Sequence, residues 1–115
     1  MNNNIKYKDK TVFFNTQPVV FNFPIGNIIE YENFIIIRLD IPLENNTRKN
    51  VFALNYDAKY LWQIQPIAEY NSALKESVYT NIEILPDKNI LATDTNGNKY
   101  KIDYKTGKFI SSAKQ

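Results

Sequence analysis

Two stretches of the chain, 27–64 and 82–111, read as two copies of one antiparallel β-meander. Residues 33–36 (Asn-Phe-Ile-Ile) align with residues 89–92 (Asn-Ile-Leu-Ala), and the copies differ in length mainly in the connection 41–49 of the first copy. A repeated supersecondary unit that varies in its loops constrains architecture more than chemistry. The repeat therefore predicts an all-β fold, and function has to be read from other features.

Each copy is expected to form a four-stranded, mainly antiparallel sheet that resembles a propeller blade. Two blades are too few to close a propeller, which has about four to eight. At 115 residues the chain is expected to be a single domain, 1–115, in which the two units form a sandwich or an open barrel. The run 34–39 is apolar on both faces, which predicts a central strand covered from two sides.

Three further segments complete the predicted fold. Residues 11–14 and 19–23 are short β-branched and aromatic runs, so we expect them to be strands that complete one of the sheets. Apolar residues between the two units fall near a helical spacing, which predicts at most one short helix near 67–76, with an ordered connection as the alternative. The pair Asn96-Gly97 predicts a type I′ hairpin turn, in which both positions have positive φ.

The composition argues against most kinds of catalytic site. The chain has no histidine and no cysteine, which removes the commonest general base, the usual zinc ligands and every Ser-His-Asp or Cys-His arrangement. Its three glycines form no phosphate-binding loop. A pair of carboxylates is the remaining enzymatic possibility, but the acidic residues lie beside turns or on polar strand faces. We therefore expect a protein that is not an enzyme, with no catalytic residue, no metal and no cofactor.

Charge and hydropathy narrow the range of partners. No run approaches the about 20 apolar residues that span a bilayer, and the N-terminus lacks the apolar core of a secretion signal. The net charge is only +2. Lys99, Lys101 and Lys105 are expected to share one strand face without the arginine and stacking aromatic residues typical of a nucleic-acid site. These features predict a cytoplasmic protein that binds neither a membrane nor nucleic acid.

Three motifs resemble those of a group of small uncharacterised bacterial β-proteins with propeller-blade-like repeats. They are Asn-Val-Phe-Ala-Leu at 50–54, Leu-Trp-Gln-Ile at 61–64 and Tyr-Lys-Ile-Asp-Tyr-Lys-Thr-Gly-Lys at 100–108. The resemblance covers 23–110 and carries no catalytic residue. It implies an immunity-type protein, the partner of a bacterial toxin. One departure is the turn 57–59, which lacks the glycine that is usual in such hairpins.

The predicted partner-binding residues lie in connections and beside turns. The connection that lengthens the first copy contains Glu44 and Arg48, and loops added to a scaffold often carry binding residues. Tyr60 and Tyr70 lie beside a turn or in a connection, and exposed tyrosines are frequent in protein interfaces. Trp62 is expected in the core.

These features predict a non-enzymatic protein-binding module, most specifically an immunity-type inhibitor that occludes a bacterial toxin domain. Two alternatives stay open. One is a small-ligand module for a sugar or a peptide, with Trp62 and neighbouring tyrosines as its platform. The other is a structural β-domain that oligomerises through its edges. The expected state is a monomer or a small homo-oligomer.

Overall fold

The computed structural model describes residues 5–14, 17–41, 49–67 and 77–111, and these residues form eleven strands. All pairings are antiparallel, in three sheets with the orders β1-β2-β3, β4-β5-β6-β7 and β11-β10-β9-β8. The strands are Ile5–Lys8 (β1), Thr11–Phe14 (β2), Gln17–Val20 (β3), Ile25–Glu30 (β4), Phe34–Leu39 (β5), Val51–Asn55 (β6), Tyr60–Gln63 (β7), Tyr79–Ile84 (β8), Ile90–Asp94 (β9), Lys99–Ile102 (β10) and Phe109–Ser111 (β11).

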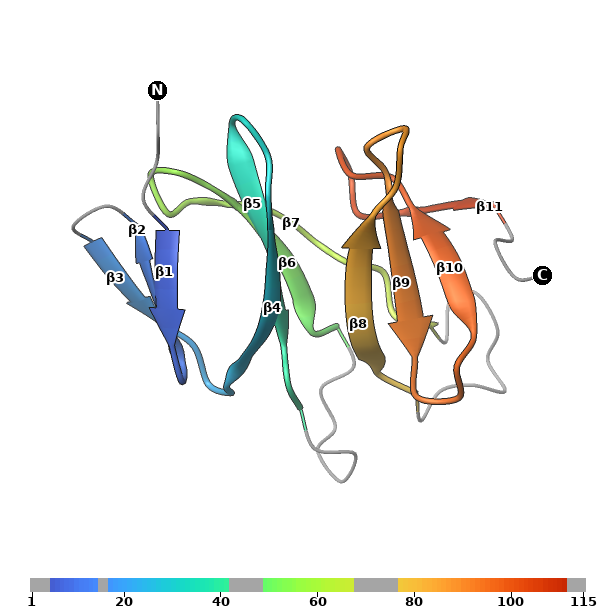
Figure 1. Ribbon diagram of the computed structural model, residues 1–115, viewed down its shortest axis with the longest axis horizontal. Coiled ribbons are helices and arrows are strands. Elements are labelled where there is room, and N and C mark those ends of the chain that lie inside the picture. The colour runs from blue at the N-terminus through green and yellow to red at the C-terminus, as the bar shows by residue number, and fades with distance from the viewer. Residues whose placement is uncertain (1–4, 15–16, 42–48, 68–76, 112–115) are drawn as a thin grey trace.

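The three sheets form successive layers along the longest axis of the molecule (Figure 1). The first sheet, β1–β3, lies on one side of the central sheet, β4–β7, and the third sheet, β8–β11, lies on the other. No sheet of the described residues closes into a barrel, so the all-β prediction is confirmed in its sandwich form. Each predicted four-stranded unit forms one sheet; that the two are copies of one unit stays a prediction.

The central strand β5 is buried on both faces, as its apolar sequence predicts. Ile36 belongs to the core between the central and third sheets. Ile35 and Ile37 belong to the core between the central and first sheets, where they join Val12 and Phe14. Successive side chains of a strand point to opposite faces, so one strand contributes to both cores. Full burial of an isoleucine stabilises by roughly 1.5–3 kcal/mol, and this central strand holds both outer sheets.

The first sheet is a separate layer. The prediction that 11–14 and 19–23 complete one of the other sheets is wrong, because β2 pairs with β3 and β1, and none of them pairs with the central sheet. The physical reason is that β1 pairs with the free edge of the β2–β3 hairpin and completes a separate three-stranded sheet. Val12 and Phe14 then pack on the face of the central sheet instead of β2 extending its edge.

The hairpin turn at Asn96-Gly97 is not type I′. Gly97 has a positive φ of 84°, whereas Asn96 does not. Gly97 N–H donates to the Asp94 carbonyl (3.1 Å) and Asp94 N–H donates to Asn98 O (2.9 Å), the pattern of a type I turn followed by one left-handed residue. The Asp94 carboxylate accepts the N–H groups of Asn96 (2.9 Å) and Asn98 (2.8 Å), which stabilises this longer turn.

The turn at 55–59 has the same hydrogen bonds without a glycine. Asn55 N–H donates to Lys59 O (2.9 Å), and Ala58 N–H donates to Asn55 O (2.9 Å). The Asn55 side-chain oxygen accepts N–H groups from Asp57 (2.9 Å) and Lys59 (3.1 Å). Ala58 occupies the left-handed position with a φ of 66°, at a cost of roughly 1–2 kcal/mol. The missing glycine therefore leaves the turn type unchanged and adds local strain.

Side-chain hydrogen bonds join the central and third sheets. Asn50 is fully buried and donates through Nδ2 to Leu39 O (2.7 Å) and Tyr79 O (2.8 Å). Its Oδ1 accepts the Tyr79 N–H (3.3 Å). Asn27 Nδ2 donates to Ile82 O (2.9 Å). These bonds fix the position of β8 along the central sheet.

The predicted helix near 67–76 lies outside the described residues, apart from Ile67. That residue is fully buried in the core between the central and third sheets. In the described part of the chain, no helix has the length and apolar character needed to cross a membrane.

Candidate functional site

Segment 20–24 carries the chain from the first sheet to the central sheet and is held by backbone hydrogen bonds. Phe21 N–H donates to Lys10 O (2.7 Å), and Ile25 N–H donates to Asp9 O (2.7 Å). Around this segment the described residues form three hollows. The hollows adjoin one another, because each pair of them shares lining residues from the segment.

The smallest hollow, of about 170 Å³, lies at the seam between the first and central sheets. Tyr60 in β7 and Val20 in β3 line it while staying 63% and 72% exposed. The Tyr60 ring packs edge-on against Phe52, with centroids 5.6 Å apart and planes at 63°. Large apolar side chains that remain exposed around a hollow are typical of binding surfaces. The lining residues are Val20, Phe21, Asn22, Phe23, Leu39, Ile41, Phe52 and Tyr60.

The second hollow, of about 570 Å³, involves the outer face of the first sheet. Phe13, which is 40% exposed, and Val20 line it beside Lys8 and Lys10. Lys6 lies on the same face as Phe13, because the two residues are paired across β1 and β2 and paired residues share a face. The outer face of the first sheet therefore combines exposed apolar side chains with a row of lysines.

The third hollow, of about 500 Å³, is lined by residues of the central sheet, of β8 and of the connection from the first sheet, and two of its charged groups, Arg38 and Asp40, pair with each other. Arg38 is buried; its Nε donates to Asn27 Oδ1 (2.6 Å) and its Nη1 forms an ion pair with Asp40 Oδ1 (2.7 Å). Gly26 makes room for the guanidinium, because a Cβ at that position would overlap it. We interpret Arg38 as a structural group that closes this end of the core.

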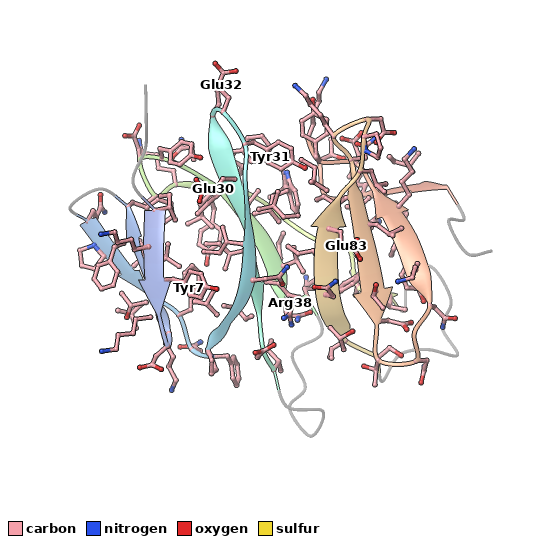
Figure 2. All side chains as sticks on the ribbon, viewed as in Figure 1. Tyr7, Glu30, Tyr31, Glu32, Arg38 and Glu83 are labelled. Atoms are coloured by element: carbon pink, nitrogen blue, oxygen red, sulfur yellow. The ribbon has the colours of Figure 1, made fainter. Side chains whose placement is uncertain are left out.

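A cluster of stacked aromatic rings closes the opposite end of the same space. Figure 2 shows Tyr31 and Arg38 at the two ends of the space between β4–β5 and β8. The Tyr31 ring stacks on Phe34 (4.7 Å, 7°) and on Tyr104 (5.1 Å, 13°), and its hydroxyl donates to Lys88 O (2.6 Å).

Burial of Tyr31, with smaller effects from the negative charges of Tyr104 and Asp87, raises its pKa to about 12. The phenol therefore stays neutral over the physiological range, and its hydrogen bond to the Lys88 carbonyl is retained there. We interpret the cluster as a structural contact between two sheets.

Tyr60 is the predicted partner-binding residue that falls within the described part of the chain. It is exposed and lines a hollow. Glu44, Arg48 and Tyr70 lie outside the described residues. The segment with Glu44 and Arg48 starts directly after Ile41, which lines two of the hollows.

Trp62, the proposed platform of the small-ligand alternative, packs against the core between the central and third sheets. Its Nε1 donates to Tyr104 O (3.1 Å), and its ring lies so close to Gly107 that a Cβ there would overlap it. One face of the indole is therefore already covered by the protein.

Two exposed residues of the surface, Phe13 and Val20, were not predicted from the sequence. Both belong to short apolar runs, in which the sequence does not show which side chains face the core. The lysine alternation in β1, with Lys6 and Lys8 on one face, is the signal that could have marked the outer face of this sheet.

In the described ranges no group of three or more His, Cys, Asp or Glu side chains is placed to hold a metal ion. The surface around segment 20–24 instead offers apolar side chains, tyrosine and lysines on sheets whose backbone is fixed by hydrogen bonds.

Residues 2–114 match the profile of the family described as Domain of unknown function (DUF7957), and the chain belongs to that family. No curated protein and no solved structure matches the chain.

Proposed function

We propose that this member of the DUF7957 family is a non-enzymatic protein-binding module that contacts its partner through the surface around Tyr60. The observation that carries the proposal is the exposure of Tyr60 (63%) and Val20 (72%) around one hollow. Exposed apolar residues scattered singly need no explanation. Here Phe13, Val20 and Tyr60 line adjoining hollows. Large side chains in such a position bury much area once a partner covers them.

The hollow beside Tyr60 is too small to enclose a small ligand by itself, whereas a side chain of a protein partner fits it. At about 170 Å³ it is smaller than the roughly 300–1,000 Å³ pockets that enclose small molecules. It has room for one apolar side chain of a partner, with Tyr60 and Val20 packing around that side chain. A standard interface of about 800 Å² per partner would extend from this hollow over the outer face of the first sheet.

The finer form of the proposal is an immunity-type inhibitor that neutralises a bacterial toxin in the cytoplasm by covering its active site. Its support is the sequence resemblance carried by the motifs at 50–54, 61–64 and 100–108. Occlusion needs a rigid surface and a few well-placed contacts. Three hydrogen-bonded sheets supply a rigid surface.

The test is affinity capture of partners by the purified chain, with the wild type compared to Tyr60→Ala. Truncation of a central interface tyrosine costs about 2 kcal/mol or more, so the variant is expected to bind its partner roughly 30-fold more weakly. Ile84→Ala is the matched control, because Ile84 is an apolar residue 50% exposed on β8, away from the hollows. The partner is expected to be retained by the control and lost by Tyr60→Ala.

The captured protein then decides the finer proposal. If it is a toxin, its expression alone is expected to arrest growth, and co-expression of the wild-type chain, but not Tyr60→Ala, is expected to restore it. A partner that binds both variants equally contradicts the Tyr60 surface. A Tyr60→Ala change that alters the size of the isolated chain on gel filtration supports the oligomerisation alternative.

A further inference from the structure

One edge of the first sheet has open hydrogen-bonding capacity. Strand β1 lies at the edge of the order β1-β2-β3 and pairs with β2 alone. Among the described residues, no other backbone group bonds to residues 5–8. The opposite edge strand, β3, carries Pro18, which has no N–H to offer an incoming strand.

The position of Pro18 shows which backbone groups of β1 face outward. Pro18 is paired with Phe13, and because proline cannot donate, the N–H and C=O of Phe13 must point to the other side, toward β1. Phe13 is paired with Lys6, so that pair forms the hydrogen bonds between β1 and β2. The backbone groups of Ile5 and Tyr7 then point in the opposite direction, to the open edge, because the direction alternates along a strand.

The side chains of β1 alternate between charge and apolar surface. Lys6 and Lys8 lie on the outer face, whereas Tyr7 shares the inner face with its paired residue Val12. Figure 2 shows Tyr7 on the side of β1 toward the central sheet. Val12 is fully buried, but Tyr7 is 48% exposed. The inner face therefore has apolar surface left uncovered beside the edge.

A second copy of this chain does not suit this edge. Two β1 strands paired with each other would place lysines across from or diagonal to lysines, and like charges directly opposite one another are destabilising. Edge lysines commonly prevent such self-pairing. The same lysines attract a strand of opposite charge.

We propose that β1 accepts a strand from the protein partner in which acidic side chains alternate with apolar ones. The acidic side chains lie beside Lys6 and Lys8 on the outer face. The apolar side chains cover Tyr7 on the inner face. Backbone hydrogen bonds to Ile5 and Tyr7 extend the sheet by one strand. This inference rests on the proposed function in that the strand belongs to a protein partner, and it names the chemistry by which that partner is recognised.

The experiment uses the ¹⁵N-labelled full chain and three synthetic ten-residue peptides. One alternates glutamate with valine, one alternates lysine with valine, and one contains five glutamates followed by five valines. With the alternating acidic peptide at millimolar concentration, hydrogen exchange of the Ile5 and Tyr7 amides is expected to slow by about tenfold, because they become hydrogen-bonded. The basic peptide and the block peptide are expected to leave both exchange rates unchanged.

Two variants separate the two parts of the recognition. Lys6→Glu combined with Lys8→Glu is expected to lower the affinity for the acidic peptide by about tenfold, since two favourable cross-strand pairs become repulsive. Tyr7→Pro removes an outward N–H without removing a bond to β2, and it is expected to abolish binding. Lys99→Glu combined with Lys108→Glu is the charge-matched control, because both lysines are exposed and lie outside the first sheet, and this variant is expected to bind like the wild type.

Unchanged exchange at Ile5 and Tyr7 with the acidic peptide overturns the proposal, as does equal protection by the basic peptide. Either result leaves the Tyr60 surface untouched, because capture of a partner that depends on Tyr60 is measured separately. Conversely, if Tyr60→Ala still captures the partner while the β1 amides are protected by the acidic peptide, the partner binds at the β1 edge and not at the seam beside Tyr60.

Discussion

The central sheet makes two seams, and they are built differently. The seam with the first sheet is apolar; its core contains Val12 and Phe14, packed against Ile35 and Ile37. In the described part of the chain no side-chain hydrogen bond between these two sheets occurs, and the Ile25 N–H to Asp9 O bond is a backbone contact at the connection. The seam with the third sheet also has an apolar core, but side-chain bonds such as those of Asn50 cross it.

The two seams therefore differ in how each outer sheet is held in position against the central sheet. Apolar burial is non-directional, so the directional contacts of the first seam are the backbone hydrogen bonds at the connection, such as Ile25 N–H to Asp9 O. Hydrogen bonds depend on distance and angle, so they fix β8 at one position along the central sheet. The candidate binding surface lies on the side of the central sheet that is held mainly by apolar packing and by the backbone hydrogen bonds at the connection.

The largest expected effect breaks the apolar seam. Phe14→Ala removes a ring that is 1% exposed and leaves a cavity facing Ile35 and Ile37, so the free energy of unfolding is expected to fall by about 3–5 kcal/mol. Phe13→Ala is the matched control one residue away, because Phe13 is 40% exposed on the outer face. Its expected loss is within about 1 kcal/mol. Urea unfolding of both variants measures the difference, and equal losses would contradict the register of the first sheet.

The next largest effect is expected at the polar seam, the contact between the central and third sheets that side-chain hydrogen bonds cross. Asn50→Ala leaves the carbonyls of Leu39 and Tyr79 without their buried amide donor, and the free energy of unfolding is expected to fall by about 2–4 kcal/mol. Asn22→Ala is the control, because Asn22 is exposed and its loss is expected to be within about 0.5 kcal/mol. A small loss for Asn50→Ala, measured in the same urea series, would show that burial alone positions β8.

A pair of glycines sharpens the comparison further. Gly107 and Gly97 both have positive φ (77° and 84°), so alanine is strained at either position. At Gly107 the added Cβ also overlaps the Trp62 ring, whereas nothing lies within 4 Å at Gly97. The expected losses are about 2–3 kcal/mol for Gly107→Ala and about 1 kcal/mol for Gly97→Ala. Thermal unfolding gives both values, and equal losses would mean that Trp62 moves aside freely.

The parts of the fold that were predictable are those decided by burial pattern. The run 34–39 is apolar on both faces, and only a strand covered from two sides buries such a run, so β5 could be placed without coordinates. Strand β1 could not, because Lys6 and Lys8 make it polar and its strand form depends on pairing with β2. The turn at 94–98 was mispredicted because the Asp94 carboxylate, absent from a two-residue rule, stabilises a longer turn.

Less of the candidate site than of the fold could be predicted from the sequence. Tyr60 follows a turn, and that local signal was enough to expect its exposure. The exposure of Val20 depends on which face of β3 meets the central sheet, and this is set by pairing with Thr11 across the hairpin. A one-residue change of register would have buried Val20, so its role follows from the fold and not from the local sequence.

The smallest expected effect concerns the aromatic contact of the polar seam and its dependence on pH. Tyr31 has a pKa raised from 10.0 to about 12, so folding favours its neutral form. This contribution to stability is fully present below pH 10 and is lost as the pH rises toward 12. Tyr31→Phe is expected to cost about 1 kcal/mol at pH 7, through loss of the bond to Lys88 O, and to flatten the decline in stability between pH 10 and 12. Burial also raises the pKa of Tyr56, so Tyr56→Phe is the control and should retain the part of the decline that comes from Tyr31. If denaturation midpoints of Tyr31→Phe and the wild type fall in parallel above pH 10, the phenol of Tyr31 ionises as easily in the folded chain as in the unfolded one, and the contact between the two sheets does not exclude water from it.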